Sequence, residues 1–219
     1  MKKISFSDKY GLTQAVLDGR KTMTRRICSI QPPYKHSVIA FPVFASDGED
    51  SPLWLAYRWI NKDTPNEYTE WIKPRYKKES EIIAIAQAYK DILDYLPDGF
   101  RSKSDGYISS IITTSEGYNN KMFVRADLMP HQVVLTNVRI QRLQDISDQD
   151  CLKEGIYKLC SANGNGGIAY SFLGASSNKH IGLYPSPREA FAVLIDKISG
   201  KGIWDRNPWV WVYEFELAK

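Results

Sequence analysis

The chain has 219 residues, 43% of them hydrophobic and 25% charged, a composition typical of a folded globular domain and not of a disordered chain. Its formal net charge of +4 permits contact with phosphate groups without demanding it. The three cysteines, Cys28, Cys151 and Cys160, form no closely spaced pair, which argues against a disulfide framework and fits a reducing compartment.

The N-terminal segment is polar from residue 7 onward, so it lacks the pattern of a signal peptide. No apolar run approaches the roughly 20 residues that a helix needs to cross a bilayer. We therefore expect a soluble, cytoplasmic protein with no membrane partner, folded as one domain over residues 1–219.

The N-terminal part begins with a predicted strand over residues 2–6. Ser7 or Asp8 can cap a following helix, and Gly19 is a natural C-terminal stop for it. The basic segment GRKTMTRR, residues 19–26, is then expected to form a loop that leads into a strand.

Residues 31–80 are rich in proline and turn-forming residues, and we interpret them as an insertion with short strands at residues 53–59 and 68–71. Residues 82–88, IIAIAQA, follow as a buried strand. Residues 90–120 form a polar excursion with a short helix near its start, which we expect to be a mobile candidate lid.

Two further strands are predicted at residues 122–125 and 132–143, the second rich in β-branched side chains. Ser147 has the spacing of a capping box and opens a helix of barely two turns that Gly155 ends. Residues 161–167, SANGNGG, are expected to form a flexible loop.

The C-terminal part carries the clearest pattern. Ser186, Pro187 and Glu189 are the cap, first-turn and capping-box residues of a helix that ends at Gly200. Residues 209–217 then alternate as a strand does, with one face that must be largely buried. That face is predicted to carry Trp209, Trp211, Tyr213, Phe215 and Leu217.

Three segments, in this order, resemble the ASCH family of the PUA-like superfamily, in its bacterial and phage-type members. They are GRKTMTRR at 19–26, LQDISDQDCLKEGI at 143–156 and GKGIWDRNPWVWVYEFE at 200–216. The resemblance implies an α+β fold, a PUA-like mixed β-barrel flanked by short helices, with insertions at about 31–80 and 90–120. The chain departs from the family at residues 82–87, where many relatives carry an Arg-Glu pair that is absent here.

The same resemblance implies a function. Related domains bind RNA or hold a single base in a pocket. One small member removes the acetyl group from acetylated cytidine and uses a Lys, a Thr three residues later and a Glu. Lys21, Thr24 and Glu154 match those motif positions, so they are the candidate catalytic residues.

Amide hydrolysis needs a nucleophile, a donor for the oxyanion and a proton for the leaving amine. Thr24 is either the nucleophile or a hydrogen-bonding partner of the substrate. Lys21 is either the base, if burial lowers its pKa, or the oxyanion partner, and Glu154 either moves a proton or orients water. The loop after Gly19 must bend for these groups to meet, because residues three apart point to opposite faces of a strand.

The plainer alternative is that Lys21, Arg25 and Arg26 form a solvated or phosphate-binding patch and that Glu154 makes a surface ion pair. Arg20, together with Arg25 and Arg26, is a candidate phosphate contact, since Arg binds phosphate in bidentate fashion.

Trp204, in the loop GIWDRNP, is the candidate stacking residue for a base, whereas Trp209 and Trp211 are expected in the core. The three histidines, His36, His131 and His180, lie far apart, so no metal and no other cofactor is expected.

Three functional interpretations stay open. The first is a pocket protein that binds RNA or a modified nucleobase or nucleoside. The second is an amidohydrolase that acts on acetylated cytidine-type nucleosides. The third is an interaction scaffold without catalytic activity.

Overall fold

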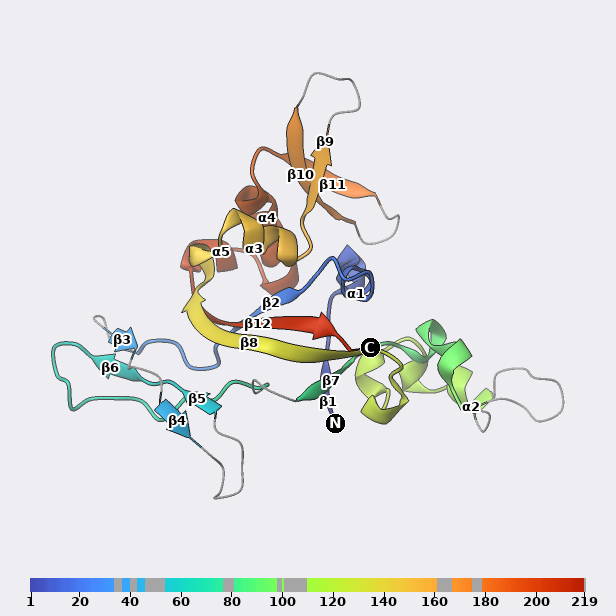
Figure 1. The fold of residues 1–219 in the computed structure, drawn as a ribbon, viewed down its shortest axis with the longest axis horizontal. Helices are drawn as coiled ribbons and strands as arrows, with labels where there is room; N and C mark the ends of the chain where they lie inside the picture. Colours follow the sequence, from blue (N-terminus) through green and yellow to red (C-terminus); the bar gives the residue numbers. More distant parts are fainter. Residues whose placement is uncertain are drawn as a thin grey trace.

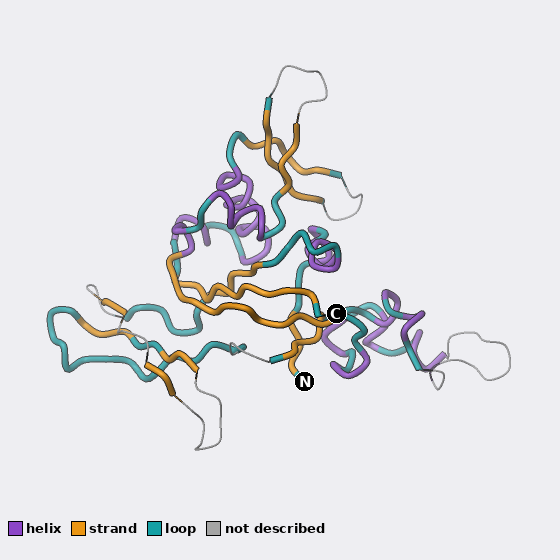
Figure 2. Tube along the Cα trace, in the orientation of Figure 1, coloured by secondary structure: helices purple, strands orange, loops and turns teal. Residues whose placement is uncertain are grey.

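The computed structural model describes residues 1–33, 37–39, 43–45, 54–76, 81–97, 100, 110–160, 167–174 and 179–218. They form an α+β fold, as predicted, in which short helices flank a central five-stranded sheet (Figure 1). A three-stranded sheet and two two-stranded ribbons project from this centre (Figure 2). Within the described ranges, no helix has the length and apolar character needed to cross a bilayer.

The central sheet has the strand order β1-β7-β8-β12-β2. Its strands are β1 (Lys2–Ile4), β7 (Ile82–Ile85), β8 (Gln132–Arg142), β12 (Trp209–Leu217) and β2 (Met23–Ile27). β1 and β7 are parallel, and the other three pairs are antiparallel.

The described strands form an open sheet with β1 and β2 at its edges, and not a closed barrel. A side chain links the two edges, because the Arg26 guanidinium on β2 donates to the carbonyl oxygen of Ser5, the residue after β1.

β12 lies between β8 and β2, and side chains on both of its faces are buried by the apolar core. Trp211, Tyr213 and Phe215 are buried, as the alternation predicts, but Leu217 at the strand's end is 38% exposed. The opposite face is also covered, since Val210 and Val212 are at most 1% exposed.

The first helical region differs in detail from the prediction. Gly11 has a left-handed φ of 63°, which separates a 3₁₀ turn, η1 (Asp8–Tyr10), from helix α1 (Leu12–Leu17). Ser7 therefore precedes the turn and makes no capping hydrogen bond through its side chain.

The insertion forms two ribbons, in which β3 (Ser37–Ile39) pairs with β6 (Trp59–Asn61) and β4 (Val43–Ala45) pairs with β5 (Trp54–Ala56). The strand predicted at 53–59 is thus two strands. The strand predicted at 68–71 is wrong, since Tyr68 makes an isolated bridge with Ile60.

Aromatic rings in edge-on and tilted contact join the insertion to β12. Tyr57 lies against Trp211, Trp59 against Trp209 and Tyr76 against Tyr213, with ring centroids 5.4, 4.9 and 5.3 Å apart, respectively. We call these six residues the aromatic ladder. The insertion therefore covers one face of β12 with its own aromatic side chains.

The polar excursion builds a small apolar cluster of its own around Ile92, Leu96 and Ile112. Its described elements are η2 (Tyr89–Asp91), η3 (Leu93–Tyr95), α2 (Ser110–Thr113), η5 (Glu116–Tyr118), η6 (Lys121–Phe123) and η7 (Ala126–Leu128). The strand predicted at 122–125 is wrong, because the Asn120 side chain accepts from the Met122 backbone and caps η6.

The C-terminal half alternates helices and strands. Its elements are η8 (Leu143–Asp145), α3 (Asp148–Lys153), β9 (Tyr157–Cys160), β10 (Ile168–Leu173), β11 (His180–Tyr184), α4 (Pro187–Ser199) and α5 (Ile203–Arg206). The predicted caps are confirmed, since Ser147 and Ser186 accept from the backbones of Asp150 and Glu189. The sheet of β9, β10 and β11 has no counterpart in the sequence prediction, and most of the loop expected at 161–167 lies outside the described residues.

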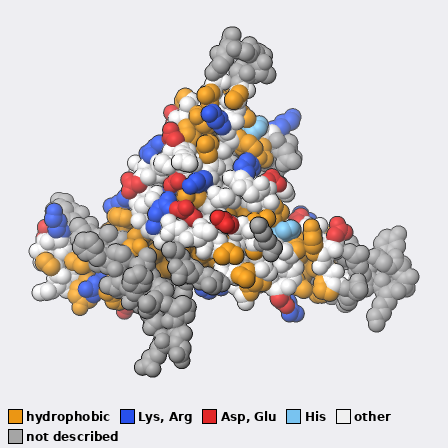
Figure 3. All heavy atoms as spheres, in the orientation of Figure 1, with side chains coloured by type: hydrophobic (Ala, Val, Ile, Leu, Met, Phe, Trp, Pro, Cys, Tyr) orange, Lys and Arg blue, Asp and Glu red, His pale blue; other side chains and the backbone are white. Residues whose placement is uncertain are grey.

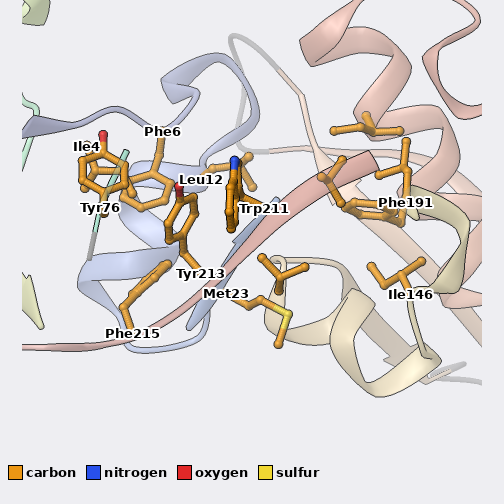
Figure 4. Packing of buried hydrophobic residues seen from close by; sticks show 14 of the residues in the cluster. Ile4, Phe6, Leu12, Met23, Tyr76, Ile146, Phe191, Trp211, Tyr213 and Phe215 are labelled. Atoms are coloured by element: carbon orange, nitrogen blue, oxygen red, sulfur yellow. The ribbon is translucent and has the colours of Figure 1, made fainter. Parts of the chain in front are cut away.

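One apolar cluster connects these parts. It runs from Phe6, Tyr76 and Tyr213 near the edge of the sheet to Ile146 and Phe191 under the helices (Figure 4). The core thus holds the insertion, the sheet and the C-terminal helices together.

We expect Trp59→Ala to lower the free energy of unfolding by about 3–5 kcal/mol, because it leaves a large cavity in the aromatic ladder. Trp59 is fully buried, and its indole Nε1 donates to the Ile30 carbonyl oxygen at 3.1 Å. Urea unfolding measures the loss. Leu183→Ala is the control, because Leu183 is 72% exposed and its truncation should change the free energy by less than about 0.5 kcal/mol. Equal losses in the two variants would contradict the packing of the insertion on the sheet.

Candidate functional site

The loop after α1 brings Lys21 to the end of α3. Gly19 has a left-handed φ of 70°, and the Lys21 backbone N–H turns back to donate to the Ala15 carbonyl oxygen at 2.7 Å. The next residue, Thr22, donates its backbone N–H to the Lys153 carbonyl oxygen at 3.0 Å. The bend that the candidate site requires is therefore present, and it is fastened to α3.

Lys21 and Glu154 form a buried ion pair, with the ammonium nitrogen 2.7 Å from Glu154 Oε2. The two residues are 2% and 4% exposed. The ammonium also donates to the carbonyl oxygens of Met23 at 2.7 Å and Glu154 at 2.8 Å. These three acceptors match the three protons that an ammonium carries.

Arg25 binds the other oxygen of the same carboxylate. Its Nη1 lies 3.0 Å from Glu154 Oε1, and its Nη2 lies 3.0 Å from Asp150 Oδ2. Asp150 in turn binds Arg139 at 3.1 Å, and Arg139 donates to Glu214. We call these six charged residues the ion network. Its three cations and three carboxylates balance, which offsets the cost of burying Lys21 and Arg25.

The ion network joins β2, β8, β12 and α3. On the face drawn in Figure 3, basic and acidic side chains lie beside one another over the central sheet. Arg25 keeps one unused donor, because its Nε is buried and has no hydrogen-bond partner among the described residues. The hydrogen bonds of the network therefore leave the Arg25 Nε–H group without a partner among the described residues.

Burial lowers the pKa of Lys21 from its ordinary value, and the nearby cations Arg26 and Arg25 lower it further. The negative charge of Glu154 opposes this shift. The pKa of Arg26 is also lowered, chiefly because its guanidinium is buried.

Gly155 fixes the position of the carboxylate. Its φ of +108° is a conformation that residues with a side chain rarely adopt. A Cβ atom there would lie 3.0 Å from Leu12 Cδ2 and 3.8 Å from Lys21 Cδ. The close approach of α1 to the end of α3 thus requires glycine next to Glu154.

The three candidate catalytic residues, Lys21, Thr24 and Glu154, line one hollow of about 170 Å³. Thr24 is 5% exposed. Arg25 and Phe191 also line this space, which we call the small hollow. Its volume is below the roughly 300–1,000 Å³ of typical ligand pockets.

A second hollow, of about 490 Å³, adjoins the first, and we call it the large hollow. Its lining includes four cations and three rings of the aromatic ladder, namely Lys3, Arg26, Lys73, Arg75, Tyr76, Trp211 and Tyr213. Ser5, Arg26 and Ile27 line both hollows. The two hollows therefore share part of their lining at the edges β1 and β2 of the sheet.

Two predicted site residues lie elsewhere. The Arg20 guanidinium lies 3.8 Å from the ring centroid of Tyr157 and donates to the Gly155 carbonyl oxygen at 3.1 Å. Trp204 packs against Phe191, with ring centroids 6.2 Å apart. Neither Arg20 nor Trp204 lines either hollow.

Apart from Arg26, the sequence did not single out the basic and aromatic lining of the large hollow as a site. Lys3, Lys73, Arg75 and Tyr76 come from the first strand and the insertion, which the motifs do not cover. The available signal was the alternation of Lys73, Pro74, Arg75 and Tyr76, which resembles a short strand with a basic face.

Two further groups bear on the chemistry. Burial raises the pKa of the Cys151 thiol, beside the ion network, to about 12, so it is a poor nucleophile at neutral pH. Within the part of the chain that the structure describes, no three His, Cys, Asp or Glu side chains are grouped to hold a metal ion.

No protein-family model matches the chain, and no curated protein or solved structure is significantly similar to it. The function of the site therefore has to follow from its own geometry and chemistry.

We expect Glu154→Gln to lower the free energy of unfolding by about 3 kcal/mol, because it leaves the buried charges of Lys21 and Arg25 without their shared partner. The exposed Glu216 on β12 provides a control that changes the same charge, and Glu216→Gln should have an effect below about 0.5 kcal/mol. Chemical denaturation of both variants tests the difference. A Glu154→Gln protein as stable as its control would show that the ion network does not hold β2 to α3.

Proposed function

We propose that this chain is a pocket protein that binds a nucleobase, nucleoside or nucleotide, free or within RNA, in the two adjoining hollows. The observation that carries the proposal is the lining of the large hollow, where four cations surround aromatic rings in about 490 Å³. Cations bind phosphate, and aromatic rings pack against bases. The volume is within the range of typical ligand pockets.

Arg26 is the central residue of this proposal. It lines both hollows, and its guanidinium is already oriented by the hydrogen bond to Ser5. An oriented guanidinium binds phosphate at a lower entropic cost than a freely rotating one. We assign Arg26 to the phosphate, with the rings of Trp211 and Tyr213 at the floor of the pocket.

The proposal includes a PUA-like fold in a modified form. The edges β1 and β2 are joined by the side chain of Arg26 and border the large hollow from two sides. The aromatic ladder of the insertion then occupies space beside β12. This arrangement is what we expect of a PUA-like barrel that the insertion has opened.

A second candidate, amide hydrolysis on an acetylated cytidine-type nucleoside, is favoured by the small hollow. Lys21, Thr24 and Glu154 line it together, and burial lowers the pKa of Lys21. Binding is the better supported function, because the Lys21 ammonium is engaged by three protein acceptors and the hollow is small.

Binding of nucleoside monophosphates and short RNA to the wild-type protein is the direct test. We expect Arg26→Gln to weaken nucleotide binding at least tenfold, because a hydrogen bond to a charged group contributes about 1.5–3 kcal/mol. Calorimetric titration at low salt measures the affinity. The exposed Arg206 is the matched control, and Arg206→Gln should bind as the wild type does.

Urea unfolding of Arg26→Gln establishes that the variant is folded. A folded Arg26→Gln protein with wild-type affinity, or a wild-type protein that binds neither nucleotides nor RNA at low salt, would refute the proposed pocket.

Acetate release from acetylated cytidine tests the second candidate. Water would add its oxygen to the acetyl carbon, the amide C–N bond would break, and the amine would take a proton. If the small hollow catalyses this step, Lys21→Met should slow it roughly 100-fold or more, because proton transfer by a placed side chain contributes about that much. Lys153→Met, one residue before Glu154, is the control. A wild-type protein that binds the nucleoside without releasing acetate would restrict the function to binding.

A further inference from the structure

Residues 71–76 form a segment with two unlike sides. Trp71, Lys73 and Arg75 are exposed, whereas the residues between and after them, Ile72, Pro74 and Tyr76, are buried. The buried side is fixed by main-chain hydrogen bonds between Ile72 and Tyr57 and by the Tyr76 hydroxyl, which donates to the Lys3 carbonyl oxygen at 2.7 Å. The segment therefore holds its exposed side chains in a defined direction.

An arginine lies over two exposed rings at the start of this segment. The Arg58 guanidinium is 4.1 Å from the ring centroid of Tyr68 and 4.6 Å from that of Trp71. Tyr68 is 54% exposed and Trp71 is 39% exposed. We call these three residues the stacking platform. Rings held by a guanidinium lose little conformational freedom when a base stacks on them.

The exposed face leads from the stacking platform into the large hollow. Trp71, Lys73 and Arg75 alternate with buried residues, so their side chains form an exposed row along the segment. Lys73 and Arg75 also line the large hollow. The aromatic platform, the basic row and the hollow with Arg26 are therefore consecutive parts of one surface.

We propose that this surface, from the stacking platform through Lys73 and Arg75 to the large hollow, is a binding track for single-stranded nucleic acid. This proposal rests on the proposed function of the large hollow and names the class of its ligand. The ligand is a single strand with one nucleotide, terminal or flipped out, that enters the large hollow. Bases stack on Tyr68 and Trp71, and the phosphates follow the basic row. This combination of rings and cations is how proteins bind single strands with little sequence preference.

The charge of the track favours an anionic ligand, and its exposed rings favour a nucleic acid over an acidic peptide. Glu70 is the single acidic residue between Tyr68 and Tyr76. An acidic peptide would use the cations but would have no need for two exposed rings. Each base of a strand has a flat face for a ring as well as a phosphate for a cation.

The test compares the affinities of fluorescein-labelled oligouridylate and oligothymidylate of increasing length with that of a mononucleotide. We expect the wild-type affinity to rise with length. Trp71→Ala should weaken oligonucleotide binding by roughly five- to 100-fold and leave mononucleotide binding unchanged. Trp71→Phe, which keeps a ring, should recover most of the loss. Tyr68→Ala should also weaken the oligonucleotide, whereas Tyr95→Ala, at a tyrosine that is 60% exposed outside the track, should not.

The results of these binding measurements distinguish the proposed binding track from the proposed nucleotide pocket. Mononucleotide binding that depends on Arg26, with oligonucleotides bound no more tightly and Trp71→Ala without effect, would overturn the track and leave the pocket. Length-dependent binding that needs Trp71 but not Arg26 would support the track and overturn the pocket. Capture of a polyglutamate peptide in place of every oligonucleotide would overturn both.

Discussion

The carboxylate of Glu154 holds two cations in a place that water scarcely reaches. One oxygen binds Lys21 and the other binds Arg25, so the loop after α1 and the strand β2 are both tied to the end of α3. Removing charges from water is costly, and such a cluster is stable only while every partner is present. The small hollow lies beside this cluster. The large hollow shares Arg26 with the small hollow. The location of the site is thus set by charge pairing across some 130 residues of chain, from Lys21 to Glu154.

The insertion determines the size of the site. Its rings cover one face of β12, and the chain that leaves the ladder supplies Lys73 and Arg75 to the wall of the large hollow. The hydroxyl of Tyr213 accepts from the Arg75 backbone N–H at 3.1 Å, which places this wall directly against the sheet. A segment that looks irregular in the sequence therefore forms part of the wall of the large hollow.

Patterns with a local physical cause were the most predictable. The serine caps of α3 and α4 and the strand β12 depend on residues within one turn or one strand, and the structure confirms them, although β12 is buried on both faces and not on one. The strand predicted at 122–125 failed because a local cap at Asn120 favoured a 3₁₀ turn. The strands β9, β10 and β11 were missed because they are short and because glycine-rich and polar stretches separate them in the sequence.

The candidate site was predictable only in part. The motif resemblance gave Lys21, Thr24 and Glu154, which the structure places around one hollow. It did not give Asp150, Arg139 or Glu214, whose pairing depends on the register of β8 with β12. Apart from Arg26, the basic wall of the large hollow was not predicted, because it depends on how the insertion docks on the sheet.

Gly155 has a consequence for attempts to move this site. The backbone turn that follows Glu154 favours glycine, because residues with a side chain rarely adopt its φ and a Cβ atom would crowd Leu12. A designer who transplanted only the charged side chains onto another scaffold would lose their geometry. The Glu-Gly dipeptide and the loop that faces it have to be grafted as one unit.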